Sequence, residues 1–166
     1  MTKETNHAET KFLAQTCCFT GHRKIPQVEL PMLKDKLKTT VTDAISNGYR
    51  YFGAGGALGF DTLAAQTVLE LKQVYPYIRL ILIFPCEEQT RGWQEADVAV
   101  YESIKQVADK VVYTSRTYYK GCMLKRNRHM VDNSSLCICY FKDEHSGTGY
   151  TVQYAREHGR TIINLA

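Results

Sequence analysis

Two glycine-rich turns contain the residue types best suited to hold a phosphate. The first lies at residues 53–61 and reads GAGGALGFD, and the second lies at residues 145–151 and reads HSGTGYT. Glycines let backbone N–H groups approach an anion, and the positive end of a following helix attracts that anion. Neither turn has the G-K-[ST] sequence of a P-loop. The positions that we expect to contact a phosphate are Gly55, Gly56, Gly147 and Thr148.

A short polar segment follows the first β-prone run of the chain. It consists of Thr20, Gly21, His22 and Arg23. Gly21 permits a tight turn, and the next two side chains offer hydrogen-bond donors to a ligand. We expect His22 to bind a ligand rather than to act as a catalytic base. The alternative is a solvent-exposed loop with incidental charge.

Asp61, Gln89 and Trp93 are candidates for contacts with the nucleoside part of a ligand. Asp61 opens the helix after the first glycine-rich turn, where it either caps that helix or accepts a hydrogen bond from a ribose hydroxyl. Gln89 and Trp93 follow the third predicted strand and have groups that bond to a base or stack on it. The Trp ring is equally suited to packing in the core.

A basic segment at residues 120–132 has four cations in nine residues and no carboxylate among them. On a helix, Asn127 shares a stripe with two methionines and Arg126 lies beside that stripe. We therefore expect Arg126 and Asn127 to reach an inner site. Lys125 and Arg128 point elsewhere and are predicted to be solvated.

Alternating strand and helix patterns place these segments at the ends of strands. Strands are predicted at residues 15–20, 49–53, 77–84, 110–114, 136–141 and 161–165. Helical spacing of apolar residues predicts helices at residues 30–45, 60–74, 93–108, 121–133 and 149–158. This alternation predicts a doubly wound, mainly parallel sheet of about six strands with helices on both faces. Ligands of such α/β sheets bind beyond the carboxyl ends of the strands, near the reversal of strand order.

Length and composition restrict the class of protein. The 166 residues, of which 44% are hydrophobic, predict a single domain at residues 14–166 that follows a polar arm at residues 1–13. A net charge of +4 is modest for a dedicated nucleic-acid-binding domain. No apolar run approaches the ~20 residues of a membrane span, so no membrane partner is expected. The polar first ten residues do not resemble a secretory signal, and we expect a cytoplasmic protein.

The six cysteines are expected to be buried, reduced thiols. Cys137 and Cys139 alternate within one strand and should share a face, whereas Cys17 and Cys18 should point to opposite faces. There is no C-x-x-C pair and no histidine pair with zinc-finger spacing, so no metal site is predicted.

Five sequence segments together resemble the bacterial YpsA-like family of the SLOG superfamily. They are CCFTGHR, GGALGFDTLAA, the segment at residues 85–93, GCMxxRNRxMVD and GTGYTVxYA. The resemblance spans about residues 15–165 and implies a Rossmann-like fold with strand order 3-2-1-4-5-6. It also implies binding or sensing of a nucleotide or a nucleotide-derived ligand such as ADP-ribose, with no required cofactor.

Two related families imply alternative functions. The LOG-like phosphoribohydrolases cleave the N-glycosidic bond of nucleoside monophosphates, and Arg126 matches their arginine. Their glutamate aligns with Thr151 or Gln153 in the two possible registers. Neither residue supplies the carboxylate that such a hydrolase needs, which argues against this enzymatic function. These relatives also imply a possible homodimer. The DNA-processing (Smf) proteins resemble residues 55–65, which makes single-stranded nucleic acid a less favoured partner that the basic segment and nearby tyrosines would bind.

Overall fold

The structure is a computed structural model that describes residues 11–166 and confirms the predicted strands and helices. Residues 1–10 of the predicted polar arm lie outside this range, and residues 11–14 are helical. The elements in chain order are β1 (Thr16–Gly21), the short 3-10 helix η1 (Gln27–Glu29), α2 (Leu30–Ser46), β2 (Tyr51–Ala54), α3 (Phe60–Lys72), β3 (Arg79–Phe84), α4 (Glu95–Val107), β4 (Lys110–Tyr113), α5 (Cys122–Asp132), β5 (Leu136–Tyr140), α6 (Gly147–Glu157) and β6 (Thr161–Asn164).

The six strands form one parallel sheet, as predicted, in a Rossmann-like α/β arrangement. The predicted order of 3-2-1-4-5-6 is wrong, because the observed order is β4-β3-β2-β1-β5-β6. β4 lies outside β3 and pairs Val111 with Leu82, and β5 takes the place beside β1. The chain therefore reverses direction after β4 rather than after β3. Hydrophobic periodicity identifies a strand but does not specify its neighbours, which is why the sequence could not correct the order.

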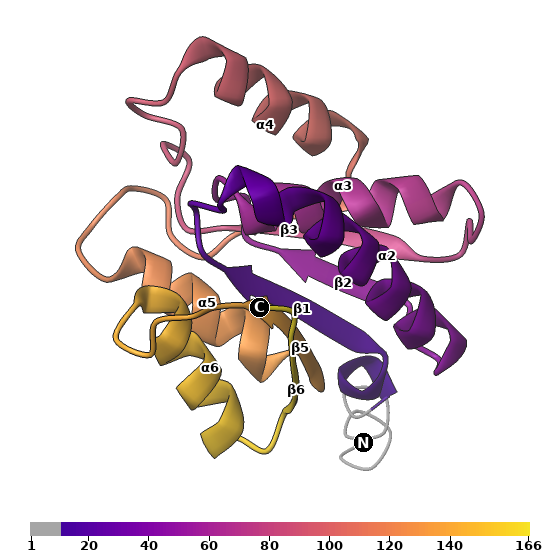
Figure 1. The fold of residues 1–166 in the computed structure, drawn as a ribbon. Helices are drawn as coiled ribbons and strands as arrows, with labels where there is room; N and C mark the ends of the chain where they lie inside the picture. The colour runs from indigo at the N-terminus through magenta and orange to yellow at the C-terminus, as the bar shows by residue number, and fades with distance from the viewer. Residues whose placement is uncertain (1–10) are drawn as a thin grey trace, which may run out of the picture.

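The helices lie on both faces of the sheet (Figure 1), with α2, α3 and α4 on one face and α5 and α6 on the other. Right-handed crossovers explain this division, since successive steps in one direction put their helices on one face. α2 shows how the sequence sets the packing, because its buried positions Leu33, Leu37 and Val41 recur with helical spacing. The helix ends just before Gly48, whose φ of 97° suits glycine.

Two apolar cores flank the sheet, and the alternation of β1 divides its side chains between them. Cys17 and Phe19 belong to the core beneath α2 and α3, and Cys18 belongs to the core beneath α5 and α6. Cys137 and Cys139 share that second core, as predicted. All six cysteines are free and buried. Within residues 11–166, no cluster of three or more His, Cys, Asp or Glu side chains could hold a metal ion.

None of the helices within residues 11–166 has the length and apolar character needed to cross a bilayer.

Candidate functional site

A pocket of about 270 Å³ lies beyond the carboxyl end of β1. Here β1 has β2 on one side and β5 on the other, so the pocket sits where the strand order reverses. Four chain segments line it: the turn after β1, the start of α3, the first turns of α5 and the start of α6. The lining residues are Thr20, Gly21, His22, Arg23, Ala57, Asp61, Met123, Leu124, Arg126, Asn127, Ser146, Gly147 and Thr148.

The pocket brings together nine of the thirteen residues that the sequence proposed as a site. They are Thr20, Gly21, His22, Arg23, Asp61, Arg126, Asn127, Gly147 and Thr148. The rule that ligands bind beyond the carboxyl edge of a parallel sheet selected all of them. The changed position of β4 leaves this edge intact, because β1 still lies at the reversal.

Arg126 is 3% exposed and holds the ends of β2 and β3 together. Its Nη1 donates to the carbonyl oxygens of Gly55 and Ile83, and its Nε donates to Oδ1 of Asn127 at 2.7 Å. Its Nη2 lies 3.9 Å from Sδ of Met123 and has no oxygen acceptor among residues 11–166. Nη1 and Nε thus have oxygen acceptors within the protein, whereas the contact of Nη2 is with the Met123 sulfur.

Asp61 is 5% exposed and lies close to Arg126. Its Oδ2 accepts a hydrogen bond from the N–H of Ala57 at 3.2 Å, which closes the glycine-rich turn. Burial raises the pKa of Asp61 to about 6, although Arg126, the Ala57 N–H and Arg23 all favour the ionised form. Burial likewise lowers the pKa of Arg126, and Asp61 opposes that shift. Burial therefore outweighs the neighbouring cations and the Ala57 N–H in setting the pKa of this carboxyl group.

The N-terminus of α6 opens directly into the pocket. Ser146 caps the helix by accepting a hydrogen bond from the Gly149 N–H at 3.0 Å. The N–H groups of Gly147 and Thr148 lie in the first turn of α6, where a helix offers no acceptor one turn earlier. Neither group donates a hydrogen bond to another residue of the described chain. A Cβ atom at Gly147 would meet nothing within 4 Å. These two N–H groups are accordingly accessible to an anion.

His22 and Arg23 differ in how far the protein already uses them. Nε2 of His22 accepts a hydrogen bond from the Lys142 N–H at 2.9 Å, and the His22 N–H donates to the Tyr140 carbonyl at 3.1 Å. His22 thus joins the end of β1 to the turn after β5. Arg23 is exposed at the pocket and its side chain has no hydrogen bond or ion pair within residues 11–166.

The other four proposed residues, Gly55, Gly56, Gln89 and Trp93, do not line the pocket. Gln89 is buried behind the glycine-rich turn, where it donates to the Gly55 carbonyl at 3.0 Å and accepts from the Tyr101 hydroxyl at 3.3 Å. The Trp93 ring packs edge-on against Tyr101 at 5.6 Å. These contacts favour the alternative of core packing for Trp93, and they make Gln89 a support of the turn rather than a contact for a base.

Sequence reasoning missed four lining residues: Ala57, Met123, Leu124 and Ser146. The signal for Ser146 was available, because a serine before a glycine-rich helix start is a common N-cap. Met123 lies one helical turn before Asn127 and therefore on the same face of the helix, so the argument that identified Asn127 applies to Met123 as well.

The pocket contains one carboxylate, that of Asp61, among its lining residues. Thr151, one of the two positions matched to the glutamate of the LOG-like enzymes, is buried and accepts a hydrogen bond from Nδ2 of Asn127 at 3.0 Å. Gln153, the other position, is exposed and bonds to Glu157 on the outside of α6. Neither position supplies a carboxylate to the site.

Comparison with known sequences places the chain among bacterial relatives. Residues 18–162 match the YspA SLOG family, YpsA. A UPF0398 protein of Halalkalibacterium halodurans is 30% identical over 128 residues, which is 75% of this chain and 68% of that protein. A UPF0398 protein of Bacillus pumilus is 30% identical over 130 residues, which is 77% of this chain and 70% of that protein.

Solved structures share the fold at low sequence identity. DNA processing protein A (DprA) from Streptococcus pneumoniae superposes with a TM-score of 0.68 at 16% identity, over 93% of this chain and 51% of that one. DNA processing protein A from Helicobacter pylori, whose structure concerns single-stranded DNA binding, gives a TM-score of 0.66 at 20% identity, over 95% of this chain and 67% of that one. With its sequence match over nearly the whole domain and this fold, the chain belongs to the YpsA family of SLOG proteins.

Proposed function

We propose that the pocket beyond β1 binds a nucleotide or a nucleotide-derived ligand of the ADP-ribose type. The observation that carries the proposal is the meeting of two open N–H groups at the start of α6 with Arg23 and Nη2 of Arg126. Helix N-termini and guanidinium groups both favour phosphate oxygens. The phosphate would lie against Gly147 and Thr148.

Asp61 is the residue that would contact the nucleoside part of the ligand. Its Oδ1 receives no hydrogen bond from residues 11–166, whereas its Oδ2 is held by Ala57. A carboxylate oxygen with free acceptor capacity suits the paired hydroxyls of a ribose. A pocket of about 270 Å³ is small for a whole dinucleotide, so the base of such a ligand would extend past the rim.

Arg23→Ala tests the proposal without disturbing buried contacts, since Arg23 is exposed. We expect it to weaken AMP and ADP-ribose binding in calorimetry about 10-fold, the effect of losing one charge-assisted hydrogen bond. Lys24→Ala is the matched control, because Lys24 is also exposed but does not line the pocket. Unchanged binding of both ligands by Arg23→Ala, or no binding by the unmodified protein, would contradict the proposal.

Binding of single-stranded DNA is the second candidate function. The turn between β4 and α5 exposes Tyr118 and Tyr119, and Arg128 lies over the exposed ring of Tyr150 at 5.4 Å. Exposed aromatic rings beside cations suit stacked bases and a phosphate backbone. This candidate predicts oligonucleotide binding that weakens steeply with salt and is reduced by Tyr118→Ala, while mononucleotides show no binding.

A further inference from the structure

Met123 places a thioether against one nitrogen of a buried arginine. Its Sδ lies 3.9 Å from Nη2 of Arg126, a residue that is 3% exposed. The two residues are three apart on α5, so the helix itself brings their side chains together. Nη2 has no oxygen acceptor among residues 11–166, whereas Nη1 and Nε have one or more. Because a thioether sulfur is a weak acceptor, this side of the buried cation is poorly satisfied.

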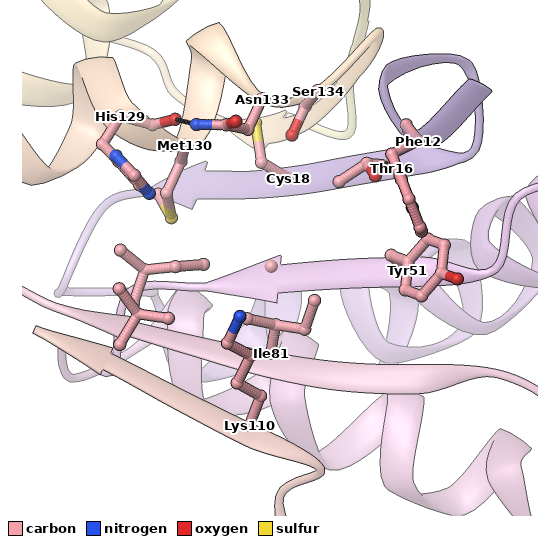
Figure 2. Close-up of a pocket in the computed structure, with 13 residues that line it drawn as sticks. Phe12, Thr16, Cys18, Tyr51, Ile81, Lys110, His129, Met130, Asn133 and Ser134 are labelled. Carbon is pink, nitrogen blue, oxygen red and sulfur yellow. Dashed lines mark hydrogen bonds between the residues drawn. The ribbon is translucent and has the colours of Figure 1, made fainter. Parts of the chain in front are cut away.

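The Met123 side chain is open to small molecules from the pocket beyond β1. It is half-buried and lines that pocket beside Arg126. Two other methionines bracket its exposure, because Met32 on α2 is 65% exposed and Met130 on α5 is 3% exposed. Met130 lines a separate groove (Figure 2), but it packs into the core beneath α5 and α6. Among residues 11–166, Met123 is thus the methionine that a small oxidant meets inside the candidate site.

Oxidation of this thioether would change what it offers to Arg126. A hydroperoxide transfers one oxygen atom to the sulfur: the O–O bond breaks, an S–O bond forms, the sulfur loses two electrons, and the peroxide leaves as water or an alcohol. The sulfoxide oxygen is a much better acceptor than the sulfur, and a hydrogen bond that it accepts from a guanidinium is charge-assisted. Since Sδ is 3.9 Å from Nη2, an oxygen on the near side of the sulfur lies within hydrogen-bond distance of that nitrogen.

We propose that Met123 is a site of reversible oxidation by a hydroperoxide, and that its sulfoxide oxygen accepts a hydrogen bond from Nη2 of Arg126. One consequence rests on the proposed function. A phosphate in the pocket would lose Nη2 as a donor, and the sulfoxide oxygen would face it with a partial negative charge. Ligand binding would therefore fall when Met123 is oxidised and recover when the sulfoxide is reduced.

Two measurements on the full chain test the modification without a nucleotide. After treatment with hydrogen peroxide, peptide mass spectrometry should find one added oxygen on Met32 and on Met123, and none on Met130. NMR spectra should show that the guanidinium resonances of Arg126, identified by their loss in Arg126→Lys, shift in the treated protein. Methionine sulfoxide reductases, one for each epimer, should reverse both changes.

Matched variants assign the NMR shift to one sulfur atom. Met123→Leu conserves the volume of the side chain and should show no shift on treatment, whereas Met32→Leu should respond like the unmodified protein. A Met123 that stays unoxidised when Met32 is fully converted would overturn the proposal. So would oxidation of Met123 that leaves the Arg126 resonances in place.

Calorimetry with AMP and ADP-ribose measures the consequence for the site. Oxidation should weaken binding by the unmodified protein and by Met32→Leu about tenfold or more, the effect of losing one charge-assisted hydrogen bond. Treated Met123→Leu should keep the affinity that it has before treatment, although it retains all six cysteines. An equal loss in Met123→Leu would assign the effect to those cysteines and overturn the regulatory role of Met123. Absence of binding by the untreated protein would instead overturn the proposed function, and the mass and NMR results would still decide the proposal on Met123.

Discussion

Arg126 illustrates how one side chain can belong both to the fold and to the site. Its Nη1 donates to the carbonyl groups of Gly55 and Ile83, and its charge lies near the buried Asp61. The sequence correctly indicated that Arg126 and Asn127 face inward while Lys125 and Arg128 are exposed. It could not indicate how much of the guanidinium the protein itself uses, since the acceptors come from strands distant in the chain.

Arg126→Ala should therefore reduce stability as well as binding. It removes the side-chain donor to the Ile83 carbonyl and one of the two side-chain donors to the Gly55 carbonyl, and it leaves the buried Asp61 without its nearest cation. We expect a loss of roughly 3–5 kcal/mol in the free energy of unfolding. Urea denaturation measures this loss, and Arg128→Ala, an exposed residue of the same helix, is the control. Equal stability of the two variants would show that Nη1 contributes little to the fold.

Asp61 makes stability depend on pH in an unusual direction. Its pKa of about 6 in the folded protein exceeds the ordinary value of 3.8, so the folded state retains a proton that the unfolded chain releases. Ionisation of Asp61 therefore destabilises the folded state relative to the unfolded chain. As a result, the contribution of Asp61 to the free energy of unfolding falls as the pH rises from about 4 to about 6. The fall amounts to about 3 kcal/mol.

Asp61→Asn should abolish that fall, because the amide has no charge to bury and can still accept from Ala57. We expect the variant to be more stable than the unmodified protein at about pH 7 and similar to it at about pH 4, as measured by urea denaturation. Asp35→Asn, an exposed position on α2, should leave the pH profile unchanged. Identical profiles for Asp61→Asn and the unmodified protein would contradict the account.

At the scale of elements, two glycines at the start of α6 look alike in the sequence but have different surroundings in the fold. Gly147 faces open space, whereas a Cβ at Gly149 would lie 2.4 Å from the Glu144 carbonyl oxygen. The sequence identified both as part of a phosphate-binding turn, but only the fold of the preceding turn shows that Gly149 is needed for close packing. Gly56 is similarly constrained, since its φ is +76° and a Cβ there would meet the Phe84 ring at 2.4 Å.

Gly147→Ala and Gly149→Ala form a matched pair that distinguishes binding from folding. Gly147→Ala should keep the melting temperature and weaken phosphate-ligand binding, because its methyl group enters the pocket beside the open N–H groups. Gly149→Ala should lower the melting temperature, because a backbone atom must move to make room for the methyl group. Calorimetry and thermal denaturation of both variants check these outcomes, and a Gly147→Ala variant with full affinity would place the anion elsewhere.

At the scale of the whole molecule, composition and periodicity predicted the class of fold and the edge on which the pocket lies. They did not predict the position of β4 in the sheet, because the residues of a strand do not specify the strand with which it pairs. The order that the family resemblance implied was incorrect. Val111 and Val112 would suit either position as apolar residues of a short strand.

The observed order also has a consequence for how the molecule is built over time. The chain from β1 to β4 consists of successive neighbours, whereas β5 must find β1, and Cys18 pairs with Cys137 across most of the sequence. Distant pairings of this kind close late and slowly. Since the turn after β1 and α3 contribute one side of the pocket and α5 and α6 the other, the pocket is complete only when β5 has paired with β1. A ligand that bridges the two halves would then act as a latch against local unfolding, and it would slow amide exchange in β5 and α6 more than in β3.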